Sequence, residues 1–128
     1  MPGIVTHFEI FAEDPAPLAD FYREIFGWKI TKAPGVDYFH VQLGDVPQAI
    51  RGGLLKRPIP GPRSWVHYVS VDSIDETLAS IERLGGKILR EKTAVPKTCW
   101  YAVVEDPQGS IFAIYQPDLL AMPEPEPD

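Results

Sequence analysis

Two side chains near the start of the chain have the chemistry of an acid/base pair. His7 and Glu9 lie two residues apart in an apolar and aromatic run that is typical of a β-strand. Because alternate residues of a strand point to the same face, we expect an imidazole and a carboxylate side by side, where each can accept or release a proton. The same spacing suits a structural ion pair. Glu9 as a catalytic base and Glu9 as a paired structural side chain therefore both stay open.

Aromatic residues in the second half of the chain are further candidates for contact with a ligand. Four of them fall in strand-like segments: Trp65, Trp100, Tyr101 and Tyr115. Trp100 and Tyr115, together with His7 and Glu9, are the side chains that we expect to bind a ligand. Aromatic side chains of strands also form cores and subunit interfaces, and this alternative stays open.

The remaining histidines and the lone cysteine receive plainer interpretations. We expect His67 to satisfy a buried hydrogen bond rather than to touch a ligand, and His40 has no partner that the sequence identifies. Cys99 is the single cysteine, so the chain can form neither an internal disulfide nor a two-cysteine metal motif.

The elements that must position these residues occur twice in the chain. A shift of 59 residues carries Gly27 onto Gly86, and Gly27 in the first half and either Gly85 or Gly86 in the second end an amphipathic helix. The first helix begins at Asp14, and the second at Ser73, which has Glu76 at the capping-box spacing. One strand precedes each helix and three follow it. The expected strands are 4–11, 28–33, 38–43 and 49–56, then 64–71, 87–93, 100–105 and 111–116.

This pattern predicts an α+β fold of two tandem βαβββ modules, with mixed curved sheets that enclose a pocket and helices outside. We expect a single domain over residues 1–121, with module one at 4–57, a proline-rich linker at 57–63 and module two at 64–117. Residues 122–128 alternate proline with acid, so we expect them to form a disordered tail.

Charge and hydropathy narrow the classes of partner. A formal net charge of -6 at pH 7 disfavours a nucleic-acid binder, which needs a basic face. The first residues carry no basic leader, and His7 and Glu9 interrupt their apolar run. We therefore expect neither a signal peptide nor contact with a membrane, and a cytoplasmic protein.

Several short motifs, taken in chain order, resemble one known family. They are His7-Phe8-Glu9-Ile10, Asp14-Pro15, Phe26-Gly27-Trp28, Gly52-Gly53-Leu54, Trp65-Val66-His67-Tyr68 and Asp106-Pro107-Gln108-Gly109. The set resembles the vicinal oxygen chelate (VOC) superfamily of glyoxalases, bleomycin resistance proteins and dioxygenases. Within it, the chain is most similar to glyoxalase-like proteins related to lactoylglutathione lyase. The resemblance covers nearly the whole chain and implies a small-molecule ligand and a homodimer.

The resemblance also implies a divalent metal such as nickel, zinc, manganese or iron, held by one side chain from each of four strands. His7 occupies the first ligand place. The other three places fall on Val66, on Gly52-Gly53 and on Ala113, none of which carries a donor. His67 is one residue from the second place, which puts it on the opposite face of its strand unless a bulge intervenes. We therefore expect a degenerate metal site that retains only His7.

Two functions remain open. In the first, a pocket with a degenerate metal site binds a small apolar or aromatic molecule, as in the bleomycin-resistance branch of the superfamily. In the second, the chain is a metal-dependent lyase or isomerase of lactoylglutathione lyase type that acts on a small carbonyl compound. His7 would then be a metal ligand and Glu9 the base. The incomplete ligand set favours the first function, whereas donors from a second subunit would favour the other.

Overall fold

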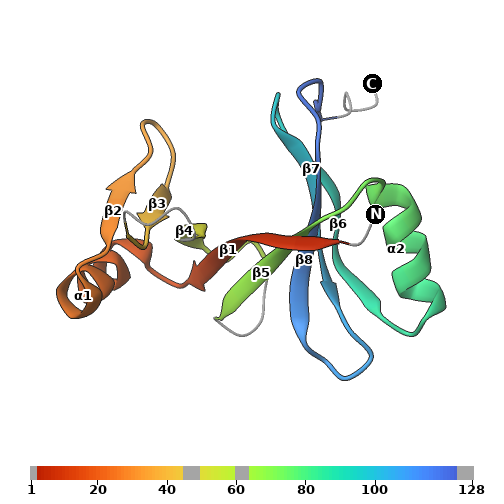
Figure 1. Cartoon of the computed structure of the whole chain (residues 1–128), viewed down its shortest axis with the longest axis horizontal. Coiled ribbons are helices and arrows are strands. Elements are labelled where there is room, and N and C mark those ends of the chain that lie inside the picture. The colour runs from red at the N-terminus through yellow and green to blue at the C-terminus, as the bar shows by residue number, and fades with distance from the viewer. Residues whose placement is uncertain (1–2, 45–49, 60–63, 124–128) are drawn as a thin grey trace. The chain divides into compact units, whose positions relative to one another are not determined.

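The computed structural model describes residues 3–44, 50–59 and 64–123 (Figure 1). Within these ranges, two helices and eight strands follow one another as β1-α1-β2-β3-β4 and then β5-α2-β6-β7-β8. The predicted α+β class and the repeated βαβββ order are therefore confirmed. The chain divides into two compact units, a first unit of Thr6–His67 and a second unit of Met1–Val5 with Tyr68–Asp128.

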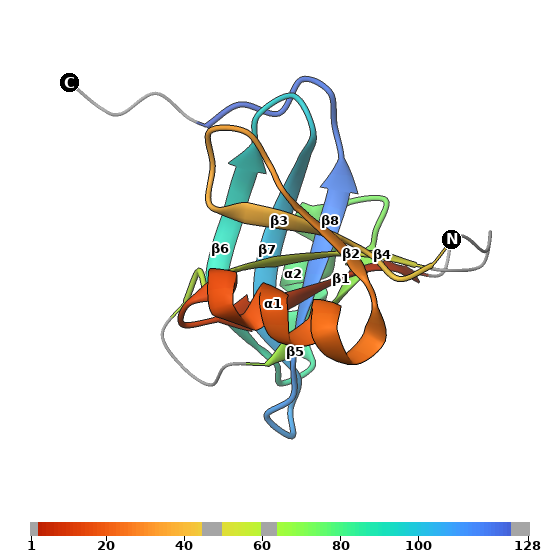
Figure 2. The same ribbon diagram turned by 90° about the vertical axis from the view of Figure 1, so that its left-hand side faces the viewer.

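The first unit is built on a four-stranded mixed sheet. Its strands are β1 (Ile4–Ala12), β2 (Lys29–Lys32), β3 (Tyr38–Gln42) and β4 (Arg51–Lys56), in the spatial order β2-β3-β4-β1. Strand β4 runs parallel to β1 and antiparallel to β3, which pairs antiparallel with β2. The helix α1 (Pro15–Phe26) connects β1 to β2 and is nearest the viewer in Figure 2.

The second unit repeats this plan. Its elements are β5 (Trp65–Ser70), which begins in the first unit, α2 (Ile74–Arg83), β6 (Lys87–Val95), β7 (Cys99–Glu105) and β8 (Ile111–Pro117). The spatial order is β5-β8-β7-β6, with β5 and β8 parallel and the other pairs antiparallel. Figure 1 shows α2 beside this sheet.

The helix ends follow the sequence signals with one exception. Ser73 accepts a hydrogen bond from the backbone N–H of Glu76 at 3.2 Å, and Gly27 ends α1 in the left-handed conformation with φ of 67°. In the second unit, Gly85 takes the positive φ of 95° after α2. Asp14 lies at the expected N-cap position of α1, but its side chain makes no capping hydrogen bond.

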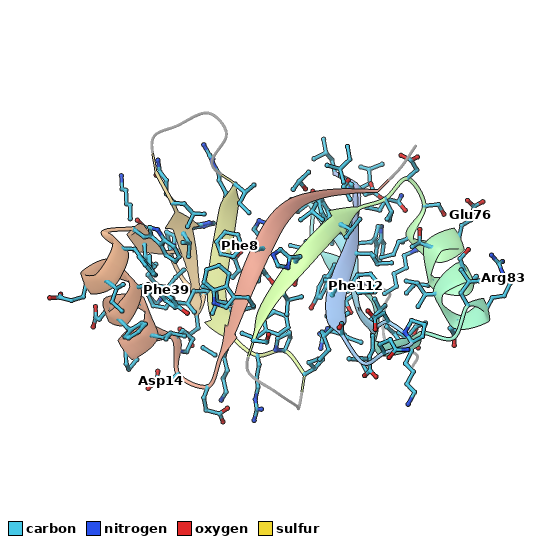
Figure 3. The ribbon with its side chains drawn as sticks, turned by 60° about the horizontal axis from the view of Figure 1, so that its bottom comes forward. Phe8, Asp14, Phe39, Glu76, Arg83 and Phe112 are labelled. Atoms are coloured by element: carbon cyan, nitrogen blue, oxygen red, sulfur yellow. The ribbon has the colours of Figure 1, made fainter. Side chains whose placement is uncertain are left out.

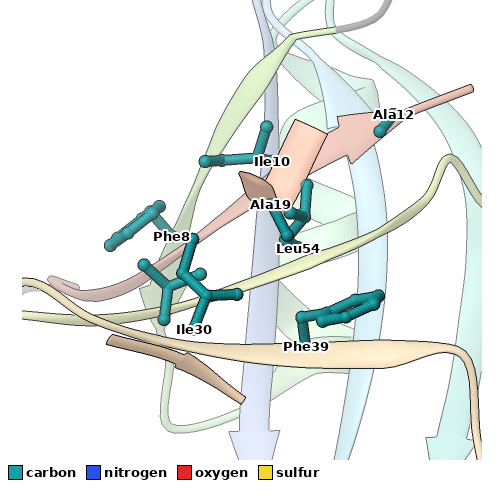
Figure 4. Close-up of a cluster of buried hydrophobic side chains, with 8 residues drawn as sticks. Phe8, Ile10, Ala12, Ala19, Ile30, Phe39 and Leu54 are labelled. Atoms are coloured by element: carbon teal, nitrogen blue, oxygen red, sulfur yellow. The ribbon is translucent and has the colours of Figure 1, made fainter. Parts of the chain in front are cut away.

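One face of the first sheet packs against α1, and this packing decides which side chains remain for chemistry. The buried cluster draws alternate residues from each strand and one from the helix (Figure 4): Phe8, Ile10, Ala12, Ala19, Ile30, Phe39, Val41 and Leu54. Each large apolar side chain buried there stabilises the fold by about 1.5–3 kcal/mol. Because strand residues alternate between faces, His7 and Glu9 lie on the face that α1 does not cover.

The second sheet buries an equivalent face against α2. Its cluster contains Ile74, Leu78, Ala102, Val104 and Ile114, with Val69, Phe112 and Trp100 among the side chains packed around it.

No helix in the described part of the chain has the length and apolar character needed to cross a membrane. The described residues do not include the predicted start of β4 at residue 49, most of the linker at 57–63 or most of the tail at 122–128.

Candidate functional site

Glu9 is the single buried polar or charged residue within the described ranges, with 9% of its surface exposed. It lies in the middle of β1, between Phe8 and Ile10, whose side chains point to the core on the opposite face. Removing a carboxylate from water costs free energy unless other groups hydrogen-bond it. The partners of Glu9 therefore define the site.

A phenol and an imidazole meet the same oxygen of Glu9. The Tyr38 hydroxyl donates a hydrogen bond to Oε2 of Glu9 at 2.9 Å, and Nε2 of His7 lies 3.5 Å from that oxygen. Burial raises the pKa of Tyr38, and the neighbouring Glu9 carboxylate raises it further. The phenol therefore keeps its proton at neutral pH and remains the donor of this hydrogen bond.

Two consecutive glycines of β4 make room for this arrangement. Gly53 is the register partner of both Glu9 and His40, and a Cβ atom at Gly53 would overlap the phenol of Tyr38. A Cβ atom at Gly52 would overlap the Phe8 ring on the core side. The absence of side chains on β4 thus allows Tyr38 on β3 to reach across it to Glu9 on β1.

A row of polar residues lies next to this contact. His7 on β1, Arg51 on β4 and Gln42 on β3 are register partners, so their side chains leave the sheet on one face, one row from Glu9. The Tyr38 ring also meets the His40 ring edge to face, with centroids 5.2 Å apart. The face of the first sheet opposite α1 thus combines a proton acceptor with several hydrogen-bond donors. Such a face can bind an oxygen-rich molecule and exchange a proton with it.

The donors on this face do not fit the metal that the family resemblance implies. Oε2 of Glu9 already accepts a hydrogen bond from the Tyr38 hydroxyl, and the next position in register, Gly53, has no side chain. Across the described residues, no three or more His, Cys, Asp or Glu side chains are grouped so that they could hold a metal ion. His7 and Glu9 alone would leave most of the coordination sphere unfilled.

The structure separates two of the aromatic residues that were expected to share a pocket. Trp100 packs against the core of the second unit, and its indole N–H donates to Oδ2 of Asp118 at 3.0 Å. Tyr115 points to the opposite face, because the preceding Ile114 belongs to that core. Trp100 and Tyr115 therefore lie on opposite faces of the second sheet, and their contact with a ligand stays a prediction. The half-buried Tyr115 ring lies near Tyr68, at 6.4 Å between ring centroids.

Trp65 and His67 also have defined places. The Trp65 ring stacks on the Phe8 ring, with 5.1 Å between the ring centroids. The indole N–H of Trp65 donates a hydrogen bond to the Tyr22 hydroxyl at 3.1 Å, so Trp65 belongs to the aromatic packing of the first unit. His67 is exposed, so the expectation that it satisfies a buried hydrogen bond is wrong, whereas its neighbour Val66 is buried. Alternation along β5 puts His67 on the side of Val69 and opposite Val66, which is the orientation expected for a strand without a bulge.

Tyr38 and Gly53 are the participants that sequence analysis missed. Tyr38 was expected only as the first residue of a strand, and Gly52-Gly53 only as a place without a metal ligand. Adjacent glycines inside a strand indicate a close approach by another group, and this signal was available. The identity of that group depends on the register between β3 and β4, which no motif in the sequence specifies.

Solved structures share this fold at low sequence identity. A Streptomyces coelicolor methylmalonyl-CoA epimerase variant in complex with 2-nitronate-propionyl-CoA has a TM-score of 0.62 and 16% identity, over 94% of this chain and 98% of that chain. A glyoxalase/bleomycin resistance protein/dioxygenase superfamily member from Vibrio splendidus 12B01 has a TM-score of 0.62 and 14% identity, over 91% and 100%. At these identities the likeness concerns the fold alone.

Two curated relatives are similar over most of this chain. "Putative glyoxylase CFP32" of Mycobacterium tuberculosis is 33% identical over 119 residues, which are 90% of this chain and 44% of the relative. "Anthracycline biosynthesis protein DnrV" of Streptomyces peucetius is 27% identical over 134 residues, which cover 93% of this chain and 49% of the relative. The chain therefore spans less than half the length of these relatives.

The family model described as Glyoxalase/Bleomycin resistance protein/Dioxygenase superfamily matches residues 4–114. This range contains all ten helices and strands of the described chain, in whole or, for β8, in part. It also contains every residue of the Glu9, Tyr38 and His7 contact. This chain belongs to the Glyoxalase/Bleomycin resistance protein/Dioxygenase superfamily, the VOC superfamily that its ordered motifs resemble.

Proposed function

We propose that this chain is a glyoxalase-like protein that binds a small carbonyl compound on the face of its first sheet opposite α1, without a complete metal site. Glu9 and His7 are the contacting groups, and Tyr38 holds Glu9 in place. The observation that carries the proposal is the buried Glu9 carboxylate, which accepts a hydrogen bond of 2.9 Å from the Tyr38 hydroxyl and has Nε2 of His7 at 3.5 Å.

Stability alone gives no reason to keep a carboxylate at this position. A buried charge contributes little net stability even when it is paired, and apolar residues of similar volume often stabilise a protein more. The Tyr38 hydroxyl hydrogen-bonds the Glu9 carboxylate, and the His7 imidazole lies beside the same oxygen. A buried carboxylate next to a phenol and an imidazole is a candidate for ligand binding.

The neighbouring side chains indicate the chemistry of the ligand. Arg51, Gln42 and His7 can donate hydrogen bonds to carbonyl or carboxylate oxygens one row from Glu9. A molecule that places a carbonyl against this row would bring its adjacent carbon near the carboxylate. The names of the relatives, a glyoxylase and a methylmalonyl-CoA epimerase, support a carbonyl-containing ligand of this kind.

A binding experiment with two carbonyl probes tests this proposal. We expect S-lactoylglutathione or methylmalonyl-CoA to shift the amide resonances of Glu9, Gly53 and their strand neighbours in NMR titrations of the whole chain. The Glu9→Gln substitution should weaken binding about tenfold or more, because it removes a charged hydrogen-bond partner. Glu24→Gln is the matched control, since Glu24 is exposed on α1. Equal affinities for these two variants would show that Glu9 is not a ligand contact.

A metal-dependent lyase of the lactoylglutathione lyase type is the second candidate. It is favoured by the position of His7 beside Glu9, but it needs donors from another subunit, because the described residues of the first unit do not supply a full ligand set. Metal analysis after incubation with nickel or zinc distinguishes the candidates. About one tightly held ion per chain supports the lyase. An ion content no higher than that of a His7→Ala variant supports the metal-independent binder.

We also propose that the chain forms a homodimer and acts in the cytoplasm. Exposed aromatic side chains on α1 support the dimer: Phe21 and Phe26 expose 52% and 58% of their surface. Aromatic residues are enriched in the cores of protein interfaces, and a helix that presents them to water is suited to contact a second copy.

A further inference from the structure

The face of the first sheet opposite α1 carries a row of polar side chains that crosses all four strands. Register pairing aligns Lys29 on β2, Gln42 on β3, Arg51 on β4 and His7 on β1. Lys29, Gln42 and Arg51 are exposed, and His7 is half-buried. We call these four residues the basic row. It lies next to Glu9, which is two residues from His7 on β1.

The charge of the basic row differs from the charge of the chain as a whole. The formal net charge is -6 at pH 7, yet Glu9 is the sole acidic residue in the described strands β1 to β4. Asp20 and Glu24 of the same unit belong to α1, which packs on the other face of the sheet, the face of Phe8 and Phe39 (Figure 3). The basic row is therefore a positive strip on a negatively charged protein.

The two permanent cations of the basic row are available to a ligand. Among the described residues, neither Lys29 nor Arg51 has an ion-pair partner, whereas Arg57 of the same unit pairs with Glu13 at 3.2 Å. A guanidinium offers a planar fork of N–H donors that fits a carboxylate or a phosphate, and an ammonium adds a point charge. Together they are suited to bind an oxyanion group.

Glu9 gives such a ligand a direction. Its carboxylate is buried at the β1 side of the sheet, so an anionic group placed there would meet a like charge. Arg51 is on β4, next to β1, and Lys29 is on β2 at the far side of the sheet. Neighbouring strands are about 4.8 Å apart, so an oxyanion between these two long side chains lies roughly 5–10 Å from β1.

We infer that the carbonyl compound bound on this face also carries a carboxylate or phosphate group, which Arg51 and Lys29 bind while the carbonyl lies at His7 and Glu9. The inference rests on the proposed function, because it extends the same site. It adds a requirement for charge and for length: the carbonyl and the oxyanion are roughly 5–10 Å apart, joined by a short chain. A neutral carbonyl compound would lose the ionic contacts and bind more weakly.

NMR titrations of the full chain with three probes test the inference. The probes share one carbon chain: 6-oxoheptanoate has the ketone and the carboxylate, 2-heptanone has only the ketone, and heptanoate has only the carboxylate. We expect 6-oxoheptanoate to shift the resonances of Lys29, Gln42 and Arg51, with a Kd on the order of 1–10 mM. It should bind about three- to tenfold more tightly than 2-heptanone, since each exposed ionic contact is weak.

Substitutions that remove one charge locate the oxyanion. Lys29→Gln and Arg51→Gln should each reduce the preference for 6-oxoheptanoate over 2-heptanone about two- to fivefold, because glutamine keeps a donor but has no charge. Lys32→Gln is the matched control. Lys32 is on β2 as well, but its register partner is the core residue Phe39, and its Nζ donates to the Val36 carbonyl at 3.0 Å.

Salt gives a reading that a purely steric effect would not change. Raising the ionic strength from about 0.01 M to about 0.5 M should remove most of the preference for 6-oxoheptanoate, because the screening length falls below the spacing of the charges. The affinity for 2-heptanone should stay nearly constant. A preference that salt leaves intact contradicts the ionic contact.

The outcomes separate this inference from the proposed function. Equal affinities for 6-oxoheptanoate and 2-heptanone overturn the inference and leave the carbonyl contact standing. A loss of preference in Lys32→Gln as large as in Lys29→Gln and Arg51→Gln also overturns it. If heptanoate binds as tightly as 6-oxoheptanoate, the oxyanion site is supported and the carbonyl contact of the proposed function fails. Absence of binding by all three probes contradicts both.

Discussion

Substituting Gly53 by alanine should break the contact between Tyr38 and Glu9 without touching either residue. The new methyl group would occupy the space of the phenol, so the Tyr38 ring must leave its position over β4. The lost hydrogen bond has a charged acceptor and is worth about 1.5–3 kcal/mol, while alanine in a strand regains about 0.5–1 kcal/mol relative to glycine. We expect a net destabilisation of about 1–2 kcal/mol.

Urea unfolding of the parent chain and four variants measures this effect. Gly44→Ala is the control, because a Cβ atom at Gly44 meets nothing within 4 Å, and it should change the free energy of unfolding by less than about 0.5 kcal/mol. Tyr38→Phe alone should cost about 1.5–3 kcal/mol, since it leaves the buried carboxylate without this donor. In the double variant of Gly53→Ala and Tyr38→Phe, the hydrogen bond is lost only once. The two effects should therefore fall short of additivity by about 1–2 kcal/mol.

The reasoning is refuted if Gly53→Ala is as stable as Gly44→Ala, or if the effects of Gly53→Ala and Tyr38→Phe simply add. Either result would mean that Tyr38 does not depend on the missing side chain of β4 to reach Glu9. Thermal unfolding gives an independent reading, since a loss of 2 kcal/mol lowers the Tm by about 6–10 °C in a domain of this size.

Three further predictions concern other contacts. Because the pKa of Tyr38 is raised in the folded chain, the unfolded chain loses the phenol proton first, near pH 10.0. Above that pH the free energy of unfolding should therefore fall, by up to about 1.4 kcal/mol per pH unit. This slope should be smaller in Tyr38→Phe when unfolding is measured across the alkaline range. Ser73→Ala should lower the free energy of unfolding in urea by about 1 kcal/mol, because it removes the capping hydrogen bond of α2. Asp14→Ala removes no such bond and should lower it by less than about 0.5 kcal/mol. Equal losses would contradict the assignment of Ser73 as the capped helix start and Asp14 as the uncapped one. Phe26→Lys should shift the chain from dimer to monomer in light scattering, and an unchanged mass would remove α1 from the interface.

Local signals in the sequence were sufficient for the elements. The strand and helix order, the end of α1 at Gly27 and the Ser73 cap all follow from neighbouring residues and are present in the structure. Asp14 shows the limit of such signals. Its residue type favours a capping hydrogen bond, but the side-chain rotamer that would make it depends on surroundings that a motif does not contain.

The candidate site was predictable in part. Strand alternation places His7 and Glu9 on one face, and the 3.5 Å distance between Nε2 and Oε2 agrees with this expectation. The sequence leaves the face of Trp100 open, because an alternating strand has two faces and both faces of β7 carry apolar or aromatic residues. The structure places Trp100 against the core that packs on α2.

The sequence by itself determined the family, the repeated βαβββ order and the pairing of an imidazole with a carboxylate on β1, because each depends on residue types a few positions apart. Only the tertiary structure decided that Tyr38 is the partner of Glu9 and that Gly53 makes room for it. These residues come from three strands, and the register that aligns them is set by packing against α1 over the whole sheet. No local pattern contains that information, since hydrogen bonding along a ladder is nearly the same in every register and the buried face selects among them.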